Sequence, residues 1–161
     1  MESIRSELTR RDALKLGGGA TLFGILVAVG ILKPSSAEAA EWNQAAFDAK
    51  TMKETFQALG AGTPAESKEI VITAPDIAEN GAVVPVQATS KLAGTESIAF
   101  LIEHNPNMLA ATFTLPEGTE PTVQTRVKMA QTSNVWVLVK AGGKFHLASK
   151  EVKVTLGGCG G

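Results

Sequence analysis

Short runs of alternating apolar and polar residues fill most of the chain from residue 63 onward. Val, Ile, Thr and Phe are frequent in these runs, and Pro, Gly, Asn and Asp separate them. The runs cover residues 70–72, 82–89, 97–103, 109–115, 122–131, 135–140 and 144–156. About seven short strands at regular spacing are typical of an all-β, antiparallel sandwich of immunoglobulin-like type. We therefore predict such a domain over residues 63–156, with its clearest hairpin at Gly142-Gly143.

Residues 42–59 follow a different pattern. Phe47, Met52, Phe56 and Leu59 recur at spacings of three to five, with alanines between them. This spacing predicts an amphipathic helix, and the glycines that follow it predict a loop, so that residues 40–62 form a helix and a linker. The apolar face of the helix either covers the sandwich or meets a partner protein.

The N-terminal 39 residues have the layout of an export signal. Arg10 and Arg11 precede an uncharged, glycine-containing run over residues 16–32, and an Ala-x-Ala site follows at residues 37–39. The paired arginines indicate a twin-arginine signal, which exports folded proteins, and we expect a periplasmic protein without a stable membrane anchor after processing. An uncleaved anchor is the alternative, although the run is at the short limit for a membrane span.

Composition and motifs argue against several functional classes. The 15 basic and 16 acidic residues nearly balance, so the charge pattern of a nucleic-acid-binding protein is missing. His104 and His146 are far apart and have no Cys or His partner at the spacing of metal ligands. We find no nucleophile elbow and no phosphate-binding loop. We therefore expect no metal, no cofactor, no catalytic residue and no enzymatic activity.

The remaining chemical feature is a single cysteine near the end of the chain. Cys159 stands between Gly157, Gly158, Gly160 and Gly161, and it has no second cysteine with which to form an internal disulfide. Glycines offer no packing surface, so we expect residues 157–161 to form a flexible arm with an exposed thiol. Five extended residues span roughly 16 to 18 Å. The arm could then carry a covalent adduct into the cleft of another protein.

These residues resemble the SoxY family, the sulfur carriers of the periplasmic thiosulfate-oxidising system. The Gly-Gly-Cys-Gly-Gly end is the signature of that family, and the resemblance extends through residues 77–81, 125–129 and 152–155. It implies that Cys159 is the site of covalent substrate attachment, as a thiosulfonate and then a persulfide. It also implies that the protein has no catalysis of its own.

The resemblance implies several partners as well. A c-type cytochrome would join thiosulfate to the thiol, and a manganese hydrolase would release sulfate. A sulfur dehydrogenase, where present, would oxidise the remaining sulfane sulfur on the same thiol. A second, SoxZ-like β-sandwich subunit would form a heterodimer with this chain.

Three other interpretations of the tail stay open. In a ubiquitin-like carrier, the carboxylate of Gly161 rather than the thiol would receive sulfur, although the export signal and the strand pattern argue against this class. A non-catalytic sandwich could instead use Cys159 for a disulfide to a partner or to a second copy. The third alternative is a tail in which the cysteine has no role. A prenylation signal is excluded because the cysteine is third, not fourth, from the end.

Overall fold

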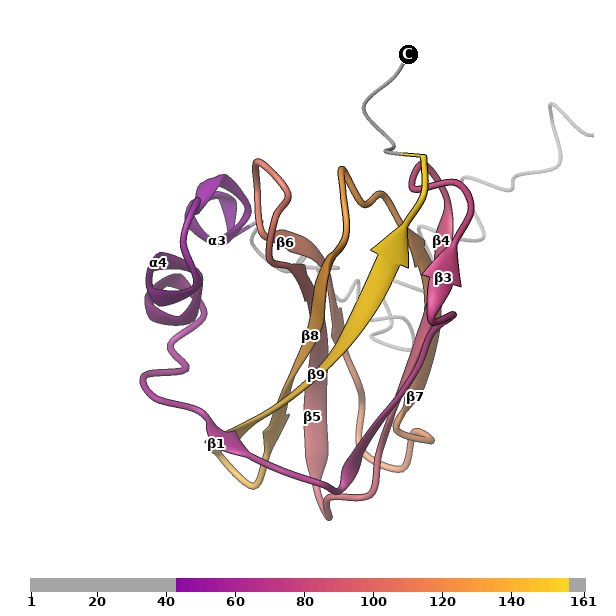
Figure 1. The fold of residues 1–161 in the computed structure, drawn as a ribbon. Helices are drawn as coiled ribbons and strands as arrows, with labels where there is room; N and C mark the ends of the chain where they lie inside the picture. Colours follow the sequence, from indigo (N-terminus) through magenta and orange to yellow (C-terminus); the bar gives the residue numbers. More distant parts are fainter. Residues whose placement is uncertain (1–42, 157–161) are drawn as a thin grey trace, which may run out of the picture. The chain divides into compact units, whose positions relative to one another are not determined.

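The computed structural model describes residues 43–156 of the 161-residue chain. This part contains two short helices and nine strands, arranged as a sandwich with helices on one side (Figure 1). The elements are α3 (Gln44–Asp48), α4 (Met52–Ala58), β1 (Ala65–Glu66), β2 (Ile70–Thr73), β3 (Ile77–Ala78), β4 (Val84–Ser90), β5 (Thr95–Ile102), β6 (Leu109–Thr114), β7 (Thr122–Val127), β8 (Ser133–Ala141) and β9 (Lys144–Val154).

Two sheets make up the sandwich. The larger has the order β1-β9-β8-β5-β6, with β3 also paired to β9, and the smaller has the order β2-β4-β7. The predicted all-β, immunoglobulin-like sandwich is confirmed. All pairs are antiparallel except those of β1 and β3, which run parallel to β9. The β8–β9 hairpin turns at Gly142 and Gly143, whose φ angles of 54° and 73° are the left-handed values that this tight turn requires.

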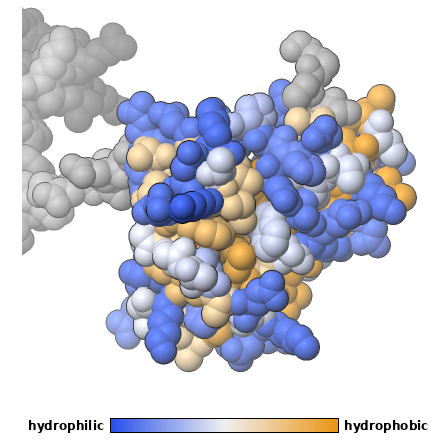
Figure 2. Space-filling model, turned by 60° about the vertical axis from the view of Figure 1, so that its left-hand side comes forward, coloured by the Kyte–Doolittle hydropathy of each residue, from blue (hydrophilic) through white to orange (hydrophobic). Residues whose placement is uncertain are grey.

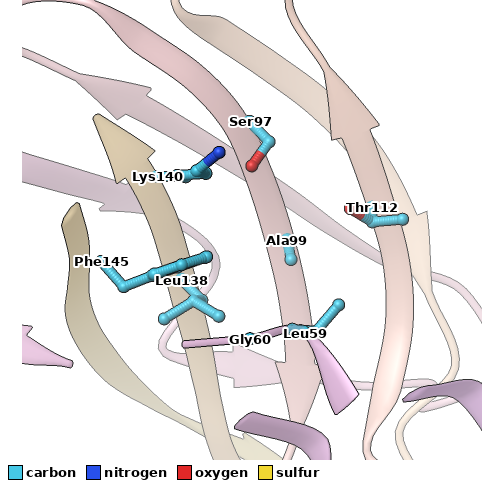
Figure 3. Close-up of a pocket in the computed structure, with 8 residues that line it drawn as sticks. All are labelled: Leu59, Gly60, Ser97, Ala99, Thr112, Leu138, Lys140 and Phe145. Atoms are coloured by element: carbon cyan, nitrogen blue, oxygen red, sulfur yellow. The ribbon is translucent and has the colours of Figure 1, made fainter. Parts of the chain in front are cut away.

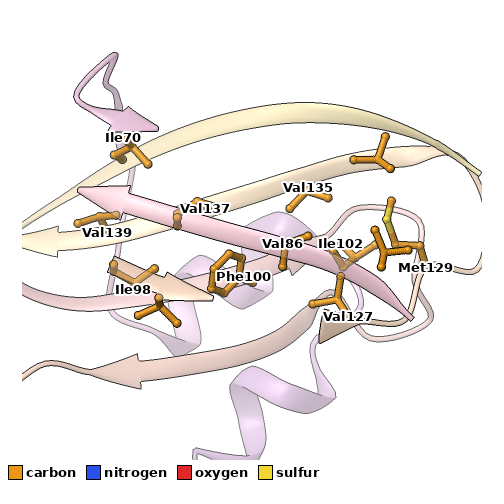
Figure 4. Close-up of a cluster of buried hydrophobic side chains, with 14 of the residues drawn as sticks. Ile70, Val86, Ile98, Phe100, Ile102, Val127, Met129, Val135, Val137 and Val139 are labelled. Carbon is orange, nitrogen blue, oxygen red and sulfur yellow. The ribbon is translucent and has the colours of Figure 1, made fainter. Parts of the chain in front are cut away.

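The core lies between the two sheets and follows from the alternation of apolar residues along the strands. In β8, Val135, Val137 and Val139 are fully buried, and the residues between them point to the other face. Phe100 of β5 is fully buried and contacts Phe113 edge to face, with ring centroids 6.2 Å apart. Figure 4 shows this cluster; its largest fully buried members are Val84, Val86, Ile98, Phe100, Ile102, Met129, Val135, Val137, Val139 and Val152.

The N-terminal helical segment differs from the prediction, because it forms two helices and not one. Ala49 is extended, with φ −60° and ψ 136°, and it ends α3. Thr51 is the N-cap of α4 and forms a capping box with Glu54: Thr51 Oγ1 accepts a hydrogen bond from the backbone N–H of Glu54, and the Glu54 carboxylate accepts one from the backbone N–H of Thr51. Both helices pack against the outer face of the larger sheet, as the cluster formed by Ala46, Phe47, Phe56, Ala99, Leu101, Leu138 and Leu147 shows. The apolar helix face therefore covers the sandwich of its own chain.

Strand β7 ends earlier than the sequence pattern predicts, at Val127 instead of residue 131. The side chain of Asn105 replaces the missing strand partner: its Nδ2 donates to the carbonyl of Lys128 at 2.7 Å, and its Oδ1 accepts from the N–H of Ala130 at 3.0 Å. These bonds from a distant loop satisfy backbone groups that a longer strand would have paired in its ladder.

The predicted export signal, with Arg10 and Arg11, lies outside the described residues. Within residues 43–156, no helix is long and apolar enough to cross a membrane.

Candidate functional site

The predicted attachment residue, Cys159, and the glycines at 157, 158, 160 and 161 also lie outside the described residues. The structure does describe the place from which they depart, which is the end of β9. We call residues 154–156 the arm root and residues 157–161 the arm. The arm root and its neighbours are the part of the candidate site whose geometry can be given.

The arm root is held on one side by β3 and the loop that follows it. The N–H of Thr155 donates to the carbonyl of Ala78 at 3.1 Å, and its hydroxyl donates to the carbonyl of Glu79 at 3.1 Å. The carbonyl of Leu156 accepts a hydrogen bond from the N–H of Gly81 at 2.8 Å. These bonds hold the backbone in place as far as Leu156.

On its other side, the arm root contacts the loop that precedes β8. The N–H of Val154 donates to Thr132 Oγ1 at 3.0 Å. The carbonyl of Thr132 lies 3.0 Å from Nδ1 of His104, whose backbone N–H donates to Ser133 Oγ. His104, one of the two histidines of the chain, therefore lies at the end of the sandwich from which the arm departs. Its role in the structure is to connect the β5–β6 and β7–β8 loops.

A carboxylate lies beside this histidine. Glu103 Oε2 accepts hydrogen bonds from Asn134 Nδ2 at 2.7 Å and from Trp136 Nε1 at 3.2 Å. The bond from Asn134, and then the bond from Trp136, lower the pKa of Glu103 below its ordinary value of 4.5. The group is thus a stable carboxylate at neutral pH, which favours a structural role over proton transfer.

His146, the other histidine, is distant from the arm root. It lies in β9 opposite Val139, near the β8–β9 hairpin at the far end of the strand. Among residues 43–156, no three His, Cys, Asp or Glu side chains are grouped so that they could hold a metal ion. The structure thus brings only one of the two histidines to the candidate site.

Three large apolar side chains are exposed around the arm root. Ile77 of β3 is 58% exposed, Val83 in the β3–β4 loop is 56% exposed, and Leu156 is 69% exposed. The space-filling view in Figure 2 shows that most of the visible surface is hydrophilic, with apolar residues exposed in places. These residues belong to three separate segments, so no periodicity in the sequence predicts their exposure.

A pocket of about 270 Å³ on the outer face of the larger sheet lies toward the opposite end of the sandwich (Figure 3). Its lining includes Leu138, Phe145 and Lys140. The ammonium of Lys140 is 2.7 Å from Glu96, and this bond, followed by the N–H of Gly143, lowers the pKa of Glu96. The lysine is therefore already paired, and the pocket is near the β8–β9 hairpin and not near the arm root.

Comparison with known proteins gives a family and one informative structure. The family model described as sulfur oxidation protein SoxY matches residues 56–159. The structure of the sulfur carrier protein SoxY from Chlorobium limicola f thiosulfatophilum is 40% identical, with a TM-score of 0.55, over 62% of this chain and 93% of that one. No curated protein matches the sequence.

Two further structures match more weakly, and both are of a superoxide reductase (neelaredoxin) from Ignicoccus hospitalis. One is 18% identical, with a TM-score of 0.44, over 53% of this chain and 79% of that one. The other is 20% identical, with a TM-score of 0.47, over 56% of this chain and 82% of that one. We draw nothing from these two likenesses.

The family match begins inside α4, runs through every strand of the sandwich and ends at Cys159. The matched range therefore includes the arm root and the predicted attachment residue. The resemblance inferred from the sequence is confirmed: the chain belongs to the SoxY family of sulfur oxidation proteins.

Proposed function

We propose that this protein is a covalent sulfur carrier in thiosulfate oxidation, with Cys159 as the attachment site. The observation that carries the proposal is the position of the only thiol in the sequence, three residues beyond the hydrogen-bonded Leu156 that follows β9, in a member of the SoxY family. The solved relative is itself named a sulfur carrier protein. Residues 157–161 act as a swinging arm on a fixed base.

The proposed cycle begins when the thiol sulfur of Cys159 bonds to the outer sulfur of thiosulfate. The thiol loses a proton, and two electrons pass to a c-type cytochrome, which leaves a cysteine S-thiosulfonate. Water then cleaves the bond between the outer sulfur and the sulfonate group in a manganese hydrolase. Sulfate and a proton leave, and a persulfide remains on Cys159.

The persulfide has two proposed fates. Where a sulfur dehydrogenase is present, that enzyme takes electrons from the sulfane sulfur while water supplies oxygen, and a second hydrolysis releases sulfate and regenerates the thiol. Otherwise the sulfane sulfur is transferred to another acceptor. In either case the chain provides the attachment point and the partners provide the catalysis.

We also propose that a SoxZ-like subunit accompanies this chain and that both reach the periplasm as a folded pair. The support is the twin-arginine pattern around Arg10 and Arg11, because that pathway exports proteins that have already folded.

Mass spectrometry of the intact protein, isolated without reductant from cells oxidising thiosulfate, tests the proposal directly. Sulfane sulfur or thiosulfonate adducts should localise to Cys159, disappear on reduction and be absent from Cys159→Ser. Sulfur on the carboxylate of Gly161 that persists in Cys159→Ser would instead identify a ubiquitin-like carrier. A permanent disulfide to another chain on non-reducing electrophoresis would support the structural-disulfide alternative.

A further inference from the structure

Hydrogen bonds hold the end of β9 beyond the point where its pairing with β3 stops. That pairing ends at Val154. Past this residue, Thr155 Oγ1 donates to the carbonyl of Glu79 at 3.1 Å, and the carbonyl of Leu156 accepts a bond from the N–H of Gly81 at 2.8 Å. The last residues of the arm root therefore depend on bonds from a loop and from one side chain.

The loop on which these bonds depend is tied to the core. Gly81 accepts a hydrogen bond at its carbonyl from the N–H of Met129 at 2.7 Å, and Met129 is fully buried. Glu79 is two residues before Gly81, and Ala78, which precedes Glu79, is buried and pairs with β9. The carbonyl of Glu79 is thus a fixed acceptor, against which the hydroxyl of Thr155 can hold the strand.

The residue before Thr155 is held from the opposite side. The N–H of Val154 donates to Thr132 Oγ1 at 3.0 Å. Thr132 is fixed in turn, because its carbonyl lies 3.0 Å from His104 Nδ1 and its neighbour Ser133 is buried. A strand end that opens from the C-terminal side therefore reaches this second threonine only after Thr155 has been released.

Opening of this end proceeds inward from Leu156. The bond between Gly81 and Leu156 breaks first, and Thr155 holds the next two bonds, since its N–H also donates to the carbonyl of Ala78 at 3.1 Å. Each hydrogen bond of this kind favours the closed state by about fivefold. Release of Thr155 is therefore disfavoured by about 25-fold, and without its hydroxyl by only about fivefold.

We propose that Thr155 is a positioning residue, whose hydroxyl stops the opening of β9 after Leu156 and so fixes where the arm begins. The inference rests on the proposed function and assigns a described side chain a part in it. A valine at this position would keep the strand propensity but would let residues 155 and 156 join the arm more often. The distance between the sandwich and the thiol of Cys159 would then vary.

The test asks whether loss of the hydroxyl restores reach to a shortened arm. Deletion of Gly157 and Gly158 leaves the cysteine directly after Leu156, so the two lost residues can be regained only if Leu156 and Thr155 are both released. Thr155→Val is added to this deletion, and Thr155→Ser is the conservative variant, because it keeps a hydroxyl. Thr132→Val is the matched control, because it removes a hydroxyl bond of the same arm root that this opening leaves intact.

The readout is single-turnover loading of the purified carrier with thiosulfate and the proposed thiosulfate-conjugating cytochrome, measured by intact mass. The deletion should slow loading by roughly 100-fold, because three bonds must open, and Thr155→Val should regain about fivefold of that loss. Thr155→Ser and Thr132→Val should stay within about twofold of the deletion alone. In the full-length chain, Thr155→Val should leave loading nearly unchanged but speed hydrogen exchange of the amide at position 155 about fivefold.

An equal gain from Thr132→Val would overturn the assignment, because it would show a general loosening of the arm root. No gain from Thr155→Val, or amide exchange at position 155 that is no faster, would also overturn it while the wild type is still loaded with sulfur. A wild-type carrier that accepts no sulfur from thiosulfate would refute the proposed function itself, and this inference with it.

Discussion

Shortening the arm by one residue is the most direct test of a carrier with a fixed base. Deleting Gly157 leaves the cysteine two residues beyond Leu156, and the maximal reach falls from about 10 to 11 Å to about 7 Å. A displacement of about 1 Å at a reacting centre can cost roughly 100-fold in rate. The rate at which an enzyme loads the cysteine should therefore fall sharply, unless the hydrogen bonds of the arm root open.

The structure also sets the smallest decrease in loading rate that we expect. The arm can regain one residue if the bond from Gly81 to Leu156 opens, and breaking one backbone hydrogen bond of this kind costs about 1 kcal/mol, or about fivefold in rate. The deletion should thus slow loading by between about fivefold and 100-fold. Further opening would have to break both bonds of Thr155, to Ala78 and to Glu79.

Lengthening the arm should have a much smaller effect. Two glycines inserted after Gly157 extend the span from three residues to five, and the entropic cost of holding the thiol in an active site rises by about (3/2)RT ln(5/3), or roughly 0.5 kcal/mol. Loading should fall only about twofold. This asymmetry between shortening and lengthening is characteristic of a tether whose maximal extension is limiting.

The assay is single-turnover loading with thiosulfate and the proposed thiosulfate-conjugating cytochrome, followed by intact-mass analysis. Alkylation by iodoacetamide controls for thiol reactivity, and Cys159→Ser gives the background. Equal tolerance of deletion and insertion would refute the reach argument, since the cysteine would then meet its enzyme without full extension.

Three further predictions concern the fold that supports the arm. Phe100→Ala should lower the free energy of unfolding by about 3 to 5 kcal/mol in chemical denaturation, because it opens a cavity in the core between the sheets; a loss below about 1 kcal/mol would contradict this packing. Thr51→Ala should lower it by about 1 kcal/mol, because it removes the N-cap that Glu54 completes, and Thr51→Ser should retain most of it. Glu103 has a lowered pKa, so its carboxylate contributes stability above its ordinary value of 4.5, and that contribution is lost as the pH falls through the lower folded value. The stability difference between the wild type and Glu103→Gln should therefore shrink below about pH 4.5, and a difference that grows on acidification would be evidence against the bonds from Asn134 and Trp136.

The long strands could be predicted because their pattern is local. Val135, Val137 and Val139 alternate with residues of the other face, and the paired glycines at 142 and 143 fit only a tight hairpin. Each signal lies within about ten residues of sequence and needs no knowledge of what packs against it. The family signature at Cys159 is equally local.

The arm root could not be predicted for the opposite reason. β1 and β3 are two residues long, and each pairs in parallel with β9, which lies far along the chain from both of them. Such pairs leave no periodicity in the sequence. The break between α3 and α4 was missed because the capping box of Thr51 and Glu54 competes with a continuous apolar pattern, and the local hydrogen bonds prevailed.

The parallel pairing of β3 has a mechanical consequence for the carrier. The end of a C-terminal strand ordinarily frays. If the end of β9 frayed, its unpaired residues would lengthen the arm by a variable amount. Here Val154 and Thr155 donate backbone hydrogen bonds to opposite sides, to Thr132 and to Ala78, and Leu156 accepts one from Gly81. Three bonds of about 1 kcal/mol each make simultaneous release rare, so that the distance between the sandwich and the thiol is set by the few residues that follow. A short tether on a firm base limits how far the thiol of Cys159 can lie from Leu156, and under the proposed function an enzyme would have to bring its active site within that distance.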